Sequence, residues 1–297
     1  MQAVVQTEGL TKHYGNVAAI DGVDIEIDPG QRVAVIGQPR SGKTTLFRLL
    51  VNLVRPTAGR ARVGGFDTSR GSYQVRRLTG WVPASVSLPG NLAVAEFLDR
   101  MAEFKRSDAD MSLRSTVLPT LDVSPDDKLR ELDDEEQHII ALLAAVQKQP
   151  DLFLLDEPLA GSGRFRELAA GILSSLNDQV TVMASARDLS LAELMGDRVL
   201  LLDNGRIIAD GPLDTLRSRV RQRTELKFSS APNESALRSL PGVLDLVVQG
   251  NTARVLSVGS TDELIDAVRP AGLVDSTVQQ PGIEELVTDH RLMAENS

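Results

Sequence analysis

The sequence predicts an α/β protein with a mostly parallel sheet, flanking helices, an antiparallel β subdomain, a helical subdomain and a small C-terminal α/β sandwich. Two short apolar runs, at 33–36 and 152–155, are typical of strands buried on both faces of a parallel sheet. Apolar residues at helical spacing follow the first run, from Leu46 to Val54. The last residues alternate short strand and helix patterns of their own. We therefore predict two domains, 1–220 and 221–297.

The N-terminal residues 1–30 predict short antiparallel strands. Apolar residues alternate with polar ones from Val23 to Ile27, and Asp28-Pro29-Gly30 is a turn signal. We expect further strand over residues 60–83. Asn204-Gly205 predicts a tight turn between two β segments near the end of the first domain.

Residues 91–149 have mostly helical periodicity, interrupted by Pro119 and Pro125. We expect them to form a helical subdomain over about 86–150. The tail pattern is strand, helix, two strands, helix, strand and helix, which predicts the α/β sandwich. Nothing in that tail looks catalytic.

Composition excludes several classes of protein. The chain has 42% apolar and 25% charged residues, as ordinary globular proteins do. Its formal net charge of −9 argues against nucleic-acid binding, which needs a basic surface. It has no cysteines, so disulfides and cysteine metal sites are excluded. No apolar run approaches the roughly 18 residues of a membrane span, and the N-terminus lacks a signal-peptide core. We therefore expect any work at a membrane to require a partner.

A phosphate-binding motif lies between the first buried strand and the helix. Gly37, four residues, then Gly42, Lys43 and Thr44 match the G-x4-G-K-[ST] pattern. The glycines let backbone N–H groups point at phosphate oxygens, and the helix directs its positive dipole end at the same anion. Lys43 would reach the terminal phosphates, and the Thr44 hydroxyl would ligate Mg²⁺. The predicted nucleotide-binding residues are Gly37, Gln38, Pro39, Arg40, Ser41, Gly42, Lys43, Thr44 and Thr45.

Two carboxylates at the end of the second apolar run complement this loop. If both runs lie in one parallel sheet, Asp156 and Glu157 fall near Lys43 and Thr44, because such sheets bind ligands at their carboxyl ends. Asp156 would hold Mg²⁺, and Glu157 would polarise the attacking water as the catalytic residue. The alternative is that Asp-Glu-Pro merely closes a strand.

The chain resembles the ATP-binding subunit of an ABC transporter, a P-loop NTPase, over residues 5 to about 215. The resemblance rests on EGLTKHYGNVAAIDGVDIEI, GQPRSGKTT, LTGWVPASVSLPGNLAVAEFL, PDLFLLDEPLAG and DRVLLLDNGRIIADGP, which occur in the family's order. The tail is similar to the accessory domain of drug-export and ABC-2-type ATPases, with PGIEELV in place of their closing motif. The resemblance implies that Tyr14 stacks on adenine; the alternative for Tyr14 is a core aromatic of a strand.

The resemblance also implies ATP and Mg²⁺ as ligands, a separate membrane permease and a second nucleotide-binding subunit as partners. It places the protein in the cytoplasm, at the inner face of the cell membrane, through its permease.

Several accessory motifs of the family are altered. Ala84 stands where the family has a glutamine, and Arg187 where it has the switch histidine. The serine-glycine-glycine signature is replaced by acidic residues after Leu132, and 161–164 departs from the usual leucine and aspartate. Within the phosphate loop, Arg40 replaces a glycine. These changes predict slow or partner-dependent hydrolysis.

The altered signature has the clearest physical consequence. In the family, this helix start offers N–H groups to the γ-phosphate bound by the opposite subunit. Four carboxylates there, Asp133 to Glu136, would repel that phosphate, because like unit charges at ~4 Å cost about 4 kcal/mol at an effective dielectric near 20. For the segment itself, a solvated and well-capped helix end is therefore the favoured interpretation. We therefore expect an asymmetric heterodimer rather than a productive homodimer.

These observations favour an ATP-binding subunit that energises or gates a membrane exporter. The alternative from another class is a regulatory protein that uses ATP as a structural switch. A P-loop kinase or GTPase is disfavoured, because the guanine-selecting N-K-x-D pattern is absent.

Overall fold

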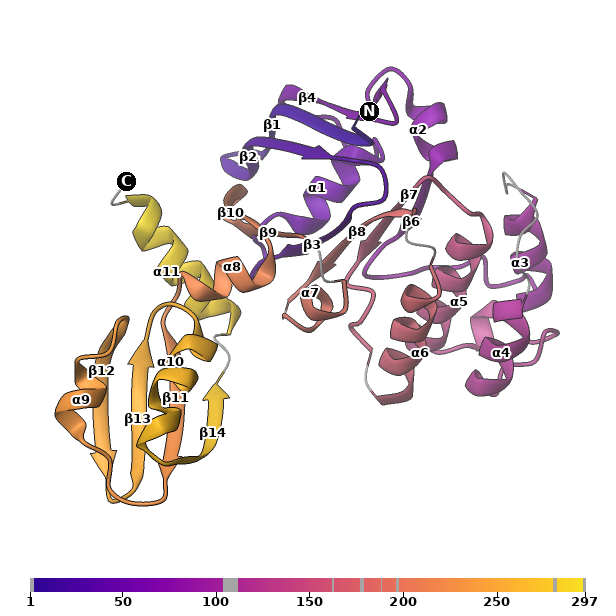
Figure 1. Ribbon diagram of the computed structural model, residues 1–297. Coiled ribbons are helices and arrows are strands. Elements are labelled where there is room, and N and C mark those ends of the chain that lie inside the picture. The colour runs from indigo at the N-terminus through magenta and orange to yellow at the C-terminus, as the bar shows by residue number, and fades with distance from the viewer. Residues whose placement is uncertain are drawn as a thin grey trace. The chain divides into compact units, whose positions relative to one another are not determined.

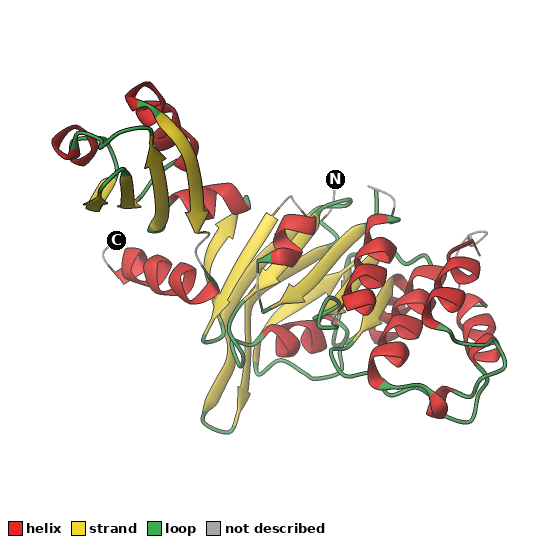
Figure 2. Ribbon diagram, turned by 90° about the horizontal axis from the view of Figure 1, so that it is seen from below, coloured by secondary structure: helices red, strands yellow, loops and turns green. Residues whose placement is uncertain are grey.

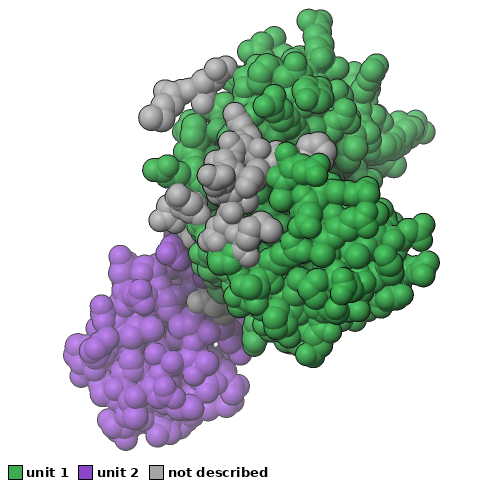
Figure 3. All heavy atoms as spheres, turned by 90° about the vertical axis from the view of Figure 1, so that its right-hand side faces the viewer, with its two compact units in different colours: residues 1–207 green, residues 208–297 purple. Residues whose placement is uncertain are grey.

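The computed structural model describes residues 3–103, 112–161, 163–176, 179–187, 189–195, 198–279 and 282–295. The chain divides into two compact units, residues 1–207 and 208–297, which are coloured separately in Figure 3. Each unit has its own cluster of buried apolar side chains. The predicted nucleotide-site residues all lie in the first unit.

A four-stranded antiparallel sheet contains the N-terminal strands. Its order is β2-β1-β4-β5, formed by β1 (Val5–Tyr14), β2 (Val17–Ile27), β4 (Ala58–Val63) and β5 (Phe66–Asp67). In β2, Val23, Ile25 and Ile27 are buried and the residues between them are exposed, as expected where one sheet face meets the core. The antiparallel pairing predicted for residues 1–30 is therefore confirmed.

A six-stranded sheet forms the centre of the first unit. Its order is β10-β9-β3-β8-β7-β6. Its strands are β3 (Arg32–Ile36), β6 (Thr79–Val82), β7 (Leu152–Asp156), β8 (Thr181–Ala186), β9 (Arg198–Asp203) and β10 (Arg206–Gly211). The pairs from β9 to β6 are parallel. The two buried strands predicted from sequence do share this sheet, with β8 between them.

The turn between β9 and β10 is the predicted Asn-Gly hairpin. Asn204 has φ 46° and Gly205 has φ 80°, so both central residues are left-handed. Such a turn matches the twist of the flanking strands, and Asn-Gly is the pair that adopts it at least cost.

Helix α1 (Lys43–Leu50) contacts strands of both sheets, namely β2, β4 and β7 (Figure 1). Four of its side chains are fully buried there, namely Leu46, Phe47, Leu49 and Leu50. The Phe47 and Trp81 rings pack edge to face, with their centroids 5.9 Å apart. Helix α7 (Ser190–Met195) packs against β3, β8 and β9. The contacts of α1 with both sheets fix the position of this helix, which follows directly on the phosphate loop.

The helices between β6 and β7 group beside the sheet (Figures 1 and 2). They are α3 (Val94–Ala102), α4 (Ser112–Leu121), a 3-10 turn (Leu129–Glu131) and α5 (Asp134–Gln147). α5 contacts α3, α4 and β6, and also α6 (Gly163–Ser174), which follows β7. The predicted helical subdomain therefore forms a packed group.

One expected strand region is partly wrong. Residues 60–83 include helix α2 (Ser72–Leu78) between β5 and β6. In α2, whose residues are all described, Val75 is the one buried side chain. A helix that buries so little has no apolar periodicity to detect.

The second unit is a β-α-β-β-α-β sandwich of the ferredoxin-like kind. Its sheet order is β12-β13-β11-β14, and helices α9 and α10 join its strands. Leu226 and Phe228 of β11 meet Leu237 of α9 and Leu264 of α10 in its core. The elements are α8 (Leu213–Ser218), β11 (Gln222–Phe228), α9 (Glu234–Arg238), β12 (Val243–Gln249), β13 (Thr252–Ser257), α10 (Thr261–Val268), a 3-10 turn (Arg269–Ala271), β14 (Leu273–Gln279) and α11 (Ile283–Glu295).

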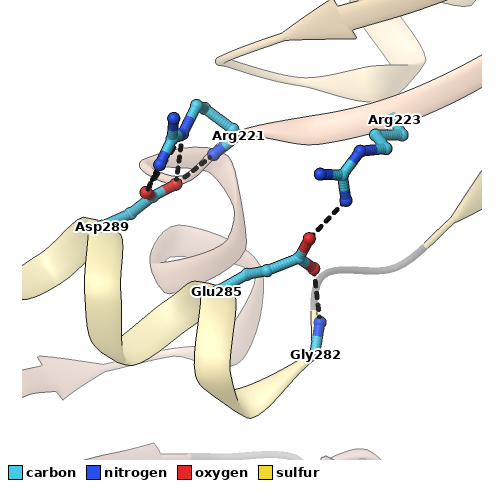
Figure 4. Close-up of polar contacts among 5 residues, drawn as sticks. All are labelled: Arg221, Arg223, Gly282, Glu285 and Asp289. Carbon is cyan, nitrogen blue, oxygen red and sulfur yellow. Dashed lines mark hydrogen bonds and ion pairs between the residues drawn. The ribbon is translucent and has the colours of Figure 1, made fainter.

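Ion pairs tie α11 to the residues at the start of β11 (Figure 4). The Arg221 guanidinium donates to both oxygens of Asp289, and the Arg221 N–H donates to Asp289 Oδ2 at 2.9 Å. Arg223 pairs with Glu285, which also accepts from the N–H of Gly282 at 3.0 Å. Burial by itself raises the pKa of Asp289, but the Arg221 hydrogen bonds outweigh it and lower that pKa.

Candidate nucleotide site

The loop between β3 and α1 is shaped by its two glycines. A Cβ at Gly37 would lie 2.4 Å from the Leu202 carbonyl oxygen and 2.4 Å from Ser41 Oγ. Gly42 has φ 114°, and a Cβ there would lie 2.3 Å from the Ala19 carbonyl oxygen. Side chains larger than hydrogen are therefore excluded at both positions, so the backbone keeps the curl that phosphate binding requires.

Arg40 also adopts a left-handed conformation, with φ 70°. A non-glycine residue pays roughly 1–2 kcal/mol for this geometry. The loop thus retains a turn suited to glycine although the sequence places arginine there. Strain of this kind is concentrated at functional sites.

The ammonium group of Lys43 closes the loop. Lys43 Nζ donates to the carbonyl oxygens of Gly37 at 2.6 Å and Gln38 at 3.0 Å, and the residue is 5% exposed. Burial lowers its pKa, while the carboxylates of Glu157 and Asp156 oppose that shift. A buried positive charge on this loop fits an anionic ligand.

The remaining predicted loop residues lie along the same turn. Pro39 is exposed, whereas Gln38 and Thr45 are half-buried. Ser41 is 4% exposed, and its hydroxyl has no hydrogen-bond partner among the described residues. A buried hydroxyl without a partner costs free energy, which is why such groups are uncommon in folded proteins.

Asp156 joins three elements at the carboxyl edge of the sheet. Its Oδ2 accepts from Thr44 Oγ1 at 2.7 Å, and its Oδ1 accepts from Ser185 Oγ at 2.5 Å. Asp156 is fully buried, and Ser185 is its neighbour across β7 and β8. Ser185 was missed from sequence, since only the strand register reveals it.

The oxygen set at Asp156 fits Mg²⁺. A hydroxyl and a carboxylate lie side by side, and Mg²⁺ typically takes one or two protein carboxylates and completes its shell with phosphates and water. Among the described residues, no cluster of three or more His, Cys, Asp or Glu side chains could hold a metal ion by itself. The site therefore suits a metal that arrives with a phosphorylated ligand.

Glu157 follows Asp156 with φ 54°. Its N–H donates to Ser185 Oγ at 3.0 Å, and its Oε1 accepts from Arg187 Nε at 2.7 Å. The sequence brought Glu157 to the site but did not predict this ion pair with Arg187. Ser162, part of the altered segment after Glu157, lies outside the described residues.

Tyr14 ends β1 and is 46% exposed, so it is not a core aromatic. The ammonium of Lys12 lies 5.1 Å from the centroid of its ring. The neighbouring strand β2 carries Ala19, whose carbonyl oxygen lies against Gly42. The stacking of the Tyr14 ring on adenine stays a prediction.

The start of α5 is capped by its own carboxylates. Asp133 Oδ1 accepts from the Glu136 N–H at 2.8 Å, and the Asp133 N–H donates to Glu136 Oε2 at 2.9 Å. Asp134 and Glu135 complete an acidic first turn. The well-capped helix end that the sequence favours for this segment is therefore confirmed.

An apolar groove of about 350 Å³ lies where β6 and its following loop meet α3 and α5; we call it the β6–α5 groove. Lys148 borders it and donates to the carbonyl oxygens of Arg76 and Thr79, each at 2.7 Å. Ala84 is exposed on the loop after β6. The other lining residues include Leu53, Trp81, Leu88, Phe97 and Met101.

No helix in the described part of the chain combines the length and apolar character needed to cross a bilayer. Comparison with known proteins matches residues 20–160 to a family model described as ABC transporter.

Among curated relatives, the daunorubicin resistance ATP-binding protein DrrA3 of Streptomyces coeruleorubidus is 27% identical, over 95% of this chain and 94% of its own length. The phosphonates import ATP-binding protein PhnC of Rhodopseudomonas palustris is 30% identical, over 80% of this chain and 95% of its own length.

Solved structures share the fold. An ATP-binding subunit of an ABC transporter aligns with a TM-score of 0.63 and 22% identity, over 72% of this chain and 92% of that one. A dimeric ATP-binding cassette bound to ADP and Pi aligns with a TM-score of 0.60 and 21% identity, over 70% of this chain and 98% of that one. These likenesses establish the ABC ATPase cassette fold, a P-loop NTPase architecture, for the first unit.

Proposed function

Because the chain belongs to the family of ABC transporter ATP-binding subunits, we propose that it binds Mg-ATP and energises or gates a separate export permease, with slow hydrolysis of its own. Residues 1–220 would form the nucleotide-binding domain and 221–297 an accessory domain. The observation that carries the proposal is the connected set of Lys43, Thr44 and Asp156 on the glycine-shaped loop.

Each group has a defined task in binding. Backbone N–H groups of the loop and the start of α1 would hold the phosphates, and Lys43 would pair with the terminal ones. Thr44 and Asp156 would hold Mg²⁺, which neutralises phosphate charge when bound. Tyr14, exposed at the end of β1, would stack on the adenine.

Hydrolysis would depend on Glu157, whose carboxylate would orient and polarise the attacking water. Its Oε1 already accepts a hydrogen bond from Arg187, and Ala84 offers no side-chain polar group. These features support a slow rate. They leave the binding groups intact, so binding and turnover are separable properties of this chain.

An acidic α5 start supports pairing with a different nucleotide-binding subunit. The N–H of Glu136, which could have met a phosphate from a facing subunit, is bonded to Asp133. The surrounding carboxylates would repel that phosphate. A homodimer would carry this obstacle at both sites, whereas a heterodimer would carry it at one.

The export assignment draws on the relatives. The match to the daunorubicin resistance protein extends over 95% of the chain and so includes most of the second unit. The match to the phosphonate import protein extends over 80% of the chain. The β6–α5 groove supplies an apolar surface for a permease segment at the inner face of the cell membrane.

Calorimetry with Mg-ATP tests the binding proposal. Lys43→Ala should abolish the titration heat, because it removes the ammonium that closes the loop. Lys227→Ala is the matched control, since that ammonium lies 3.6 Å from Asp275 in the second unit. Unchanged affinity in Lys43→Ala would overturn the assignment of the loop.

Affinity purification from the native membrane tests the partner. An integral membrane protein should co-purify, and Met101→Glu should reduce its yield by placing a charge in the groove. Leu244→Glu, at a residue 55% exposed in the second unit, serves as the control. Equal recovery of the membrane protein with both variants would contradict the binding of the permease at the β6–α5 groove.

A further inference from the structure

A stretch without acidic residues runs through α2, β6 and the loop that follows β6. No aspartate or glutamate occurs between Asp67 and Glu96, in a chain that carries 41 acidic residues. The same stretch contains three basic residues, Arg70, Arg76 and Arg77. A concentration of positive charge on a chain of net charge −9 directs the attraction of anions to one surface.

Helix α2 presents these arginines to solvent. It packs against β5 and β6, and its Val75 side chain is buried (Figure 1). Arg70, Arg76 and Arg77 are all exposed. Among the residues that the structure describes, no carboxylate pairs with these three guanidinium groups, and Arg76 makes one long contact, of 3.5 Å, to Ser72 Oγ. Their charges are therefore available to a partner.

The carboxylate that precedes them in the sequence is used by the backbone. Asp67 Oδ1 accepts from the N–H groups of Ser69 at 2.9 Å and Arg70 at 3.2 Å. Such bonds shape the turn that leads into α2. Asp67 thus supports the presentation of the arginines and does not pair with them.

Two exposed aromatic side chains accompany the arginines. Tyr73 is 70% exposed and lies three residues before Arg76 and four before Arg77, so these three side chains are neighbours on the helix. Phe66 lies beside the turn before α2, where a Cβ built on Gly71 would be 3.1 Å from Phe66 Cβ. Aromatic rings beside basic groups are typical of surfaces at the headgroup level of a bilayer. We call this set the α2 surface: Phe66, Arg70, Tyr73, Arg76 and Arg77.

The α2 surface is continuous with the β6–α5 groove. Arg76 also lines that groove, and its carbonyl oxygen accepts from Lys148 Nζ at 2.7 Å. The proposed function places a permease segment in the groove, at the inner face of the membrane. Because the two surfaces share Arg76, a permease segment bound there brings the α2 surface to the lipid headgroups.

We propose that the α2 surface binds the anionic lipid headgroups of the bilayer that holds the permease. Each guanidinium offers a planar fork to a lipid phosphate, and the Tyr73 ring lies at the level of the headgroups. The exposed aromatic rings and the adjoining groove favour a bilayer over an acidic protein as the partner. This inference rests on the proposed function for the position of the groove and adds a lipid contact to it.

Three arginines make this contact weak by itself. Each basic residue near an anionic surface strengthens partitioning by roughly fivefold. The net charge of −9 opposes the approach of the rest of the chain. The contact therefore orients a subunit that its permease already holds, and it weakens with salt, because the Debye length falls from about 10 Å at 0.1 M to about 3 Å at 1 M.

Co-sedimentation of the purified full chain with lipid vesicles tests the proposal. One vesicle is phosphatidylcholine alone, and the other mixes it with an equal amount of phosphatidylglycerol. In low salt the chain should partition onto the anionic vesicles at least about tenfold more than onto the neutral ones. That preference should vanish at about 1 M salt. Equal partitioning onto both vesicles in low salt would overturn the proposal.

A triple variant assigns the preference to the α2 surface. Arg70→Gln with Arg76→Gln and Arg77→Gln should remove the preference for anionic vesicles, a loss of at least about tenfold. A control variant removes three exposed, ion-paired arginines of the second unit and so makes the same change in net charge: Arg238→Gln, Arg254→Gln and Arg269→Gln. The control should keep the preference. An equal loss in both variants would place the effect in the total charge and contradict the role of α2.

Two further measurements keep the outcomes separate. Thermal unfolding should show the parent's midpoint for the triple variant, because its changed side chains are exposed. Arg77→Glu, a single change, should by itself lower the preference by about fivefold or more. An unchanged preference in Arg77→Glu would count against the proposal.

A labelled polyglutamate peptide tests the other class of partner. If it binds the chain through the three arginines while neither vesicle does, the α2 surface fits an acidic protein and the lipid proposal fails. These assays contain no permease and no nucleotide. Their failure would therefore leave the Mg-ATP and co-purification tests of the proposed function unaffected.

Discussion

The acidic start of α5 gives the sharpest test of the asymmetric arrangement. We consider a triple variant, Asp133→Ser, Asp134→Gly and Glu135→Gly, which removes three of four carboxylates and keeps Glu136. Serine is also a good N-cap, and Glu136 now accepts from the N–H of residue 133 at 2.9 Å. The reciprocal capping pair should therefore survive in its serine form.

The expected gain in dimerisation follows from charge. One carboxylate at ~4 Å from a facing phosphate costs about 4 kcal/mol at an effective dielectric near 20, and about 1 kcal/mol in bulk water. These acidic residues are partly exposed, so we take a figure near the lower end. The ATP-dependent dimer should strengthen by at least about tenfold, or about 1.4 kcal/mol. Each new glycine costs up to about 1 kcal/mol of helix stability, which thermal unfolding would register.

The assay is sedimentation velocity with Mg-ATP or Mg-ADP, in a Glu157→Gln background that prevents turnover. The parent should stay monomeric with both nucleotides, and the triple variant should dimerise with ATP only. Asp262→Gly with Glu263→Gly, at the acidic start of α10, controls for the two new glycines and for the loss of two carboxylates elsewhere in the chain. ATP-dependent dimers of the parent, or a triple variant that never dimerises, would refute the role given to these carboxylates.

Three further variants test the loop, the second unit and the core. Gly42→Ala should weaken Mg-ATP binding at least tenfold in calorimetry, because φ 114° costs a non-glycine residue roughly 1–3 kcal/mol and its Cβ would strike a carbonyl oxygen; wild-type affinity would contradict this. Asp289→Asn should destabilise the chain by about 1–2 kcal/mol at pH 7 in urea unfolding, since it weakens charged hydrogen bonds to a half-exposed Arg221. Because the pKa of Asp289 is lowered in the fold, its contribution is present above the unfolded pKa of about 3.9 and is lost as pH falls through the folded pKa, so the penalty should shrink in acid. Phe47→Ala should cost about 3–5 kcal/mol by the same method, because the ring is fully buried; a loss below 1 kcal/mol would contradict the packing.

The parts of the fold with strong local patterns could be predicted from sequence. The buried runs of β3 and β7, the Asn-Gly turn and the order of elements in the tail all carry periodic or turn signals. Helix α2 was missed because it is a short surface helix that buries a single side chain. Periodicity detects burial, so an element without burial leaves no pattern.

The site divides in the same way. Gly37 and Lys43 follow from motif spacing, because phosphate binding requires these residue types at fixed positions. Asp156 follows from its place at the end of the second buried apolar run. Ser185 could not be found, since its place beside Asp156 depends on the register of β7 and β8. The pairing of Arg187 with Glu157 joins residues 30 apart in sequence through side-chain conformation, which no motif encodes.

The central claim is that this chain holds Mg-ATP without splitting it quickly. The most direct measurement mixes excess purified chain with radiolabelled ATP and Mg²⁺, separates bound from free nucleotide, and follows the ADP fraction of the bound pool over time. We predict that nucleotide is retained and remains ATP for minutes, far longer than the turnover time of enzymes with a typical kcat of about 10 per second. Conversion of the bound pool to ADP within seconds, or no retained nucleotide, would contradict the account.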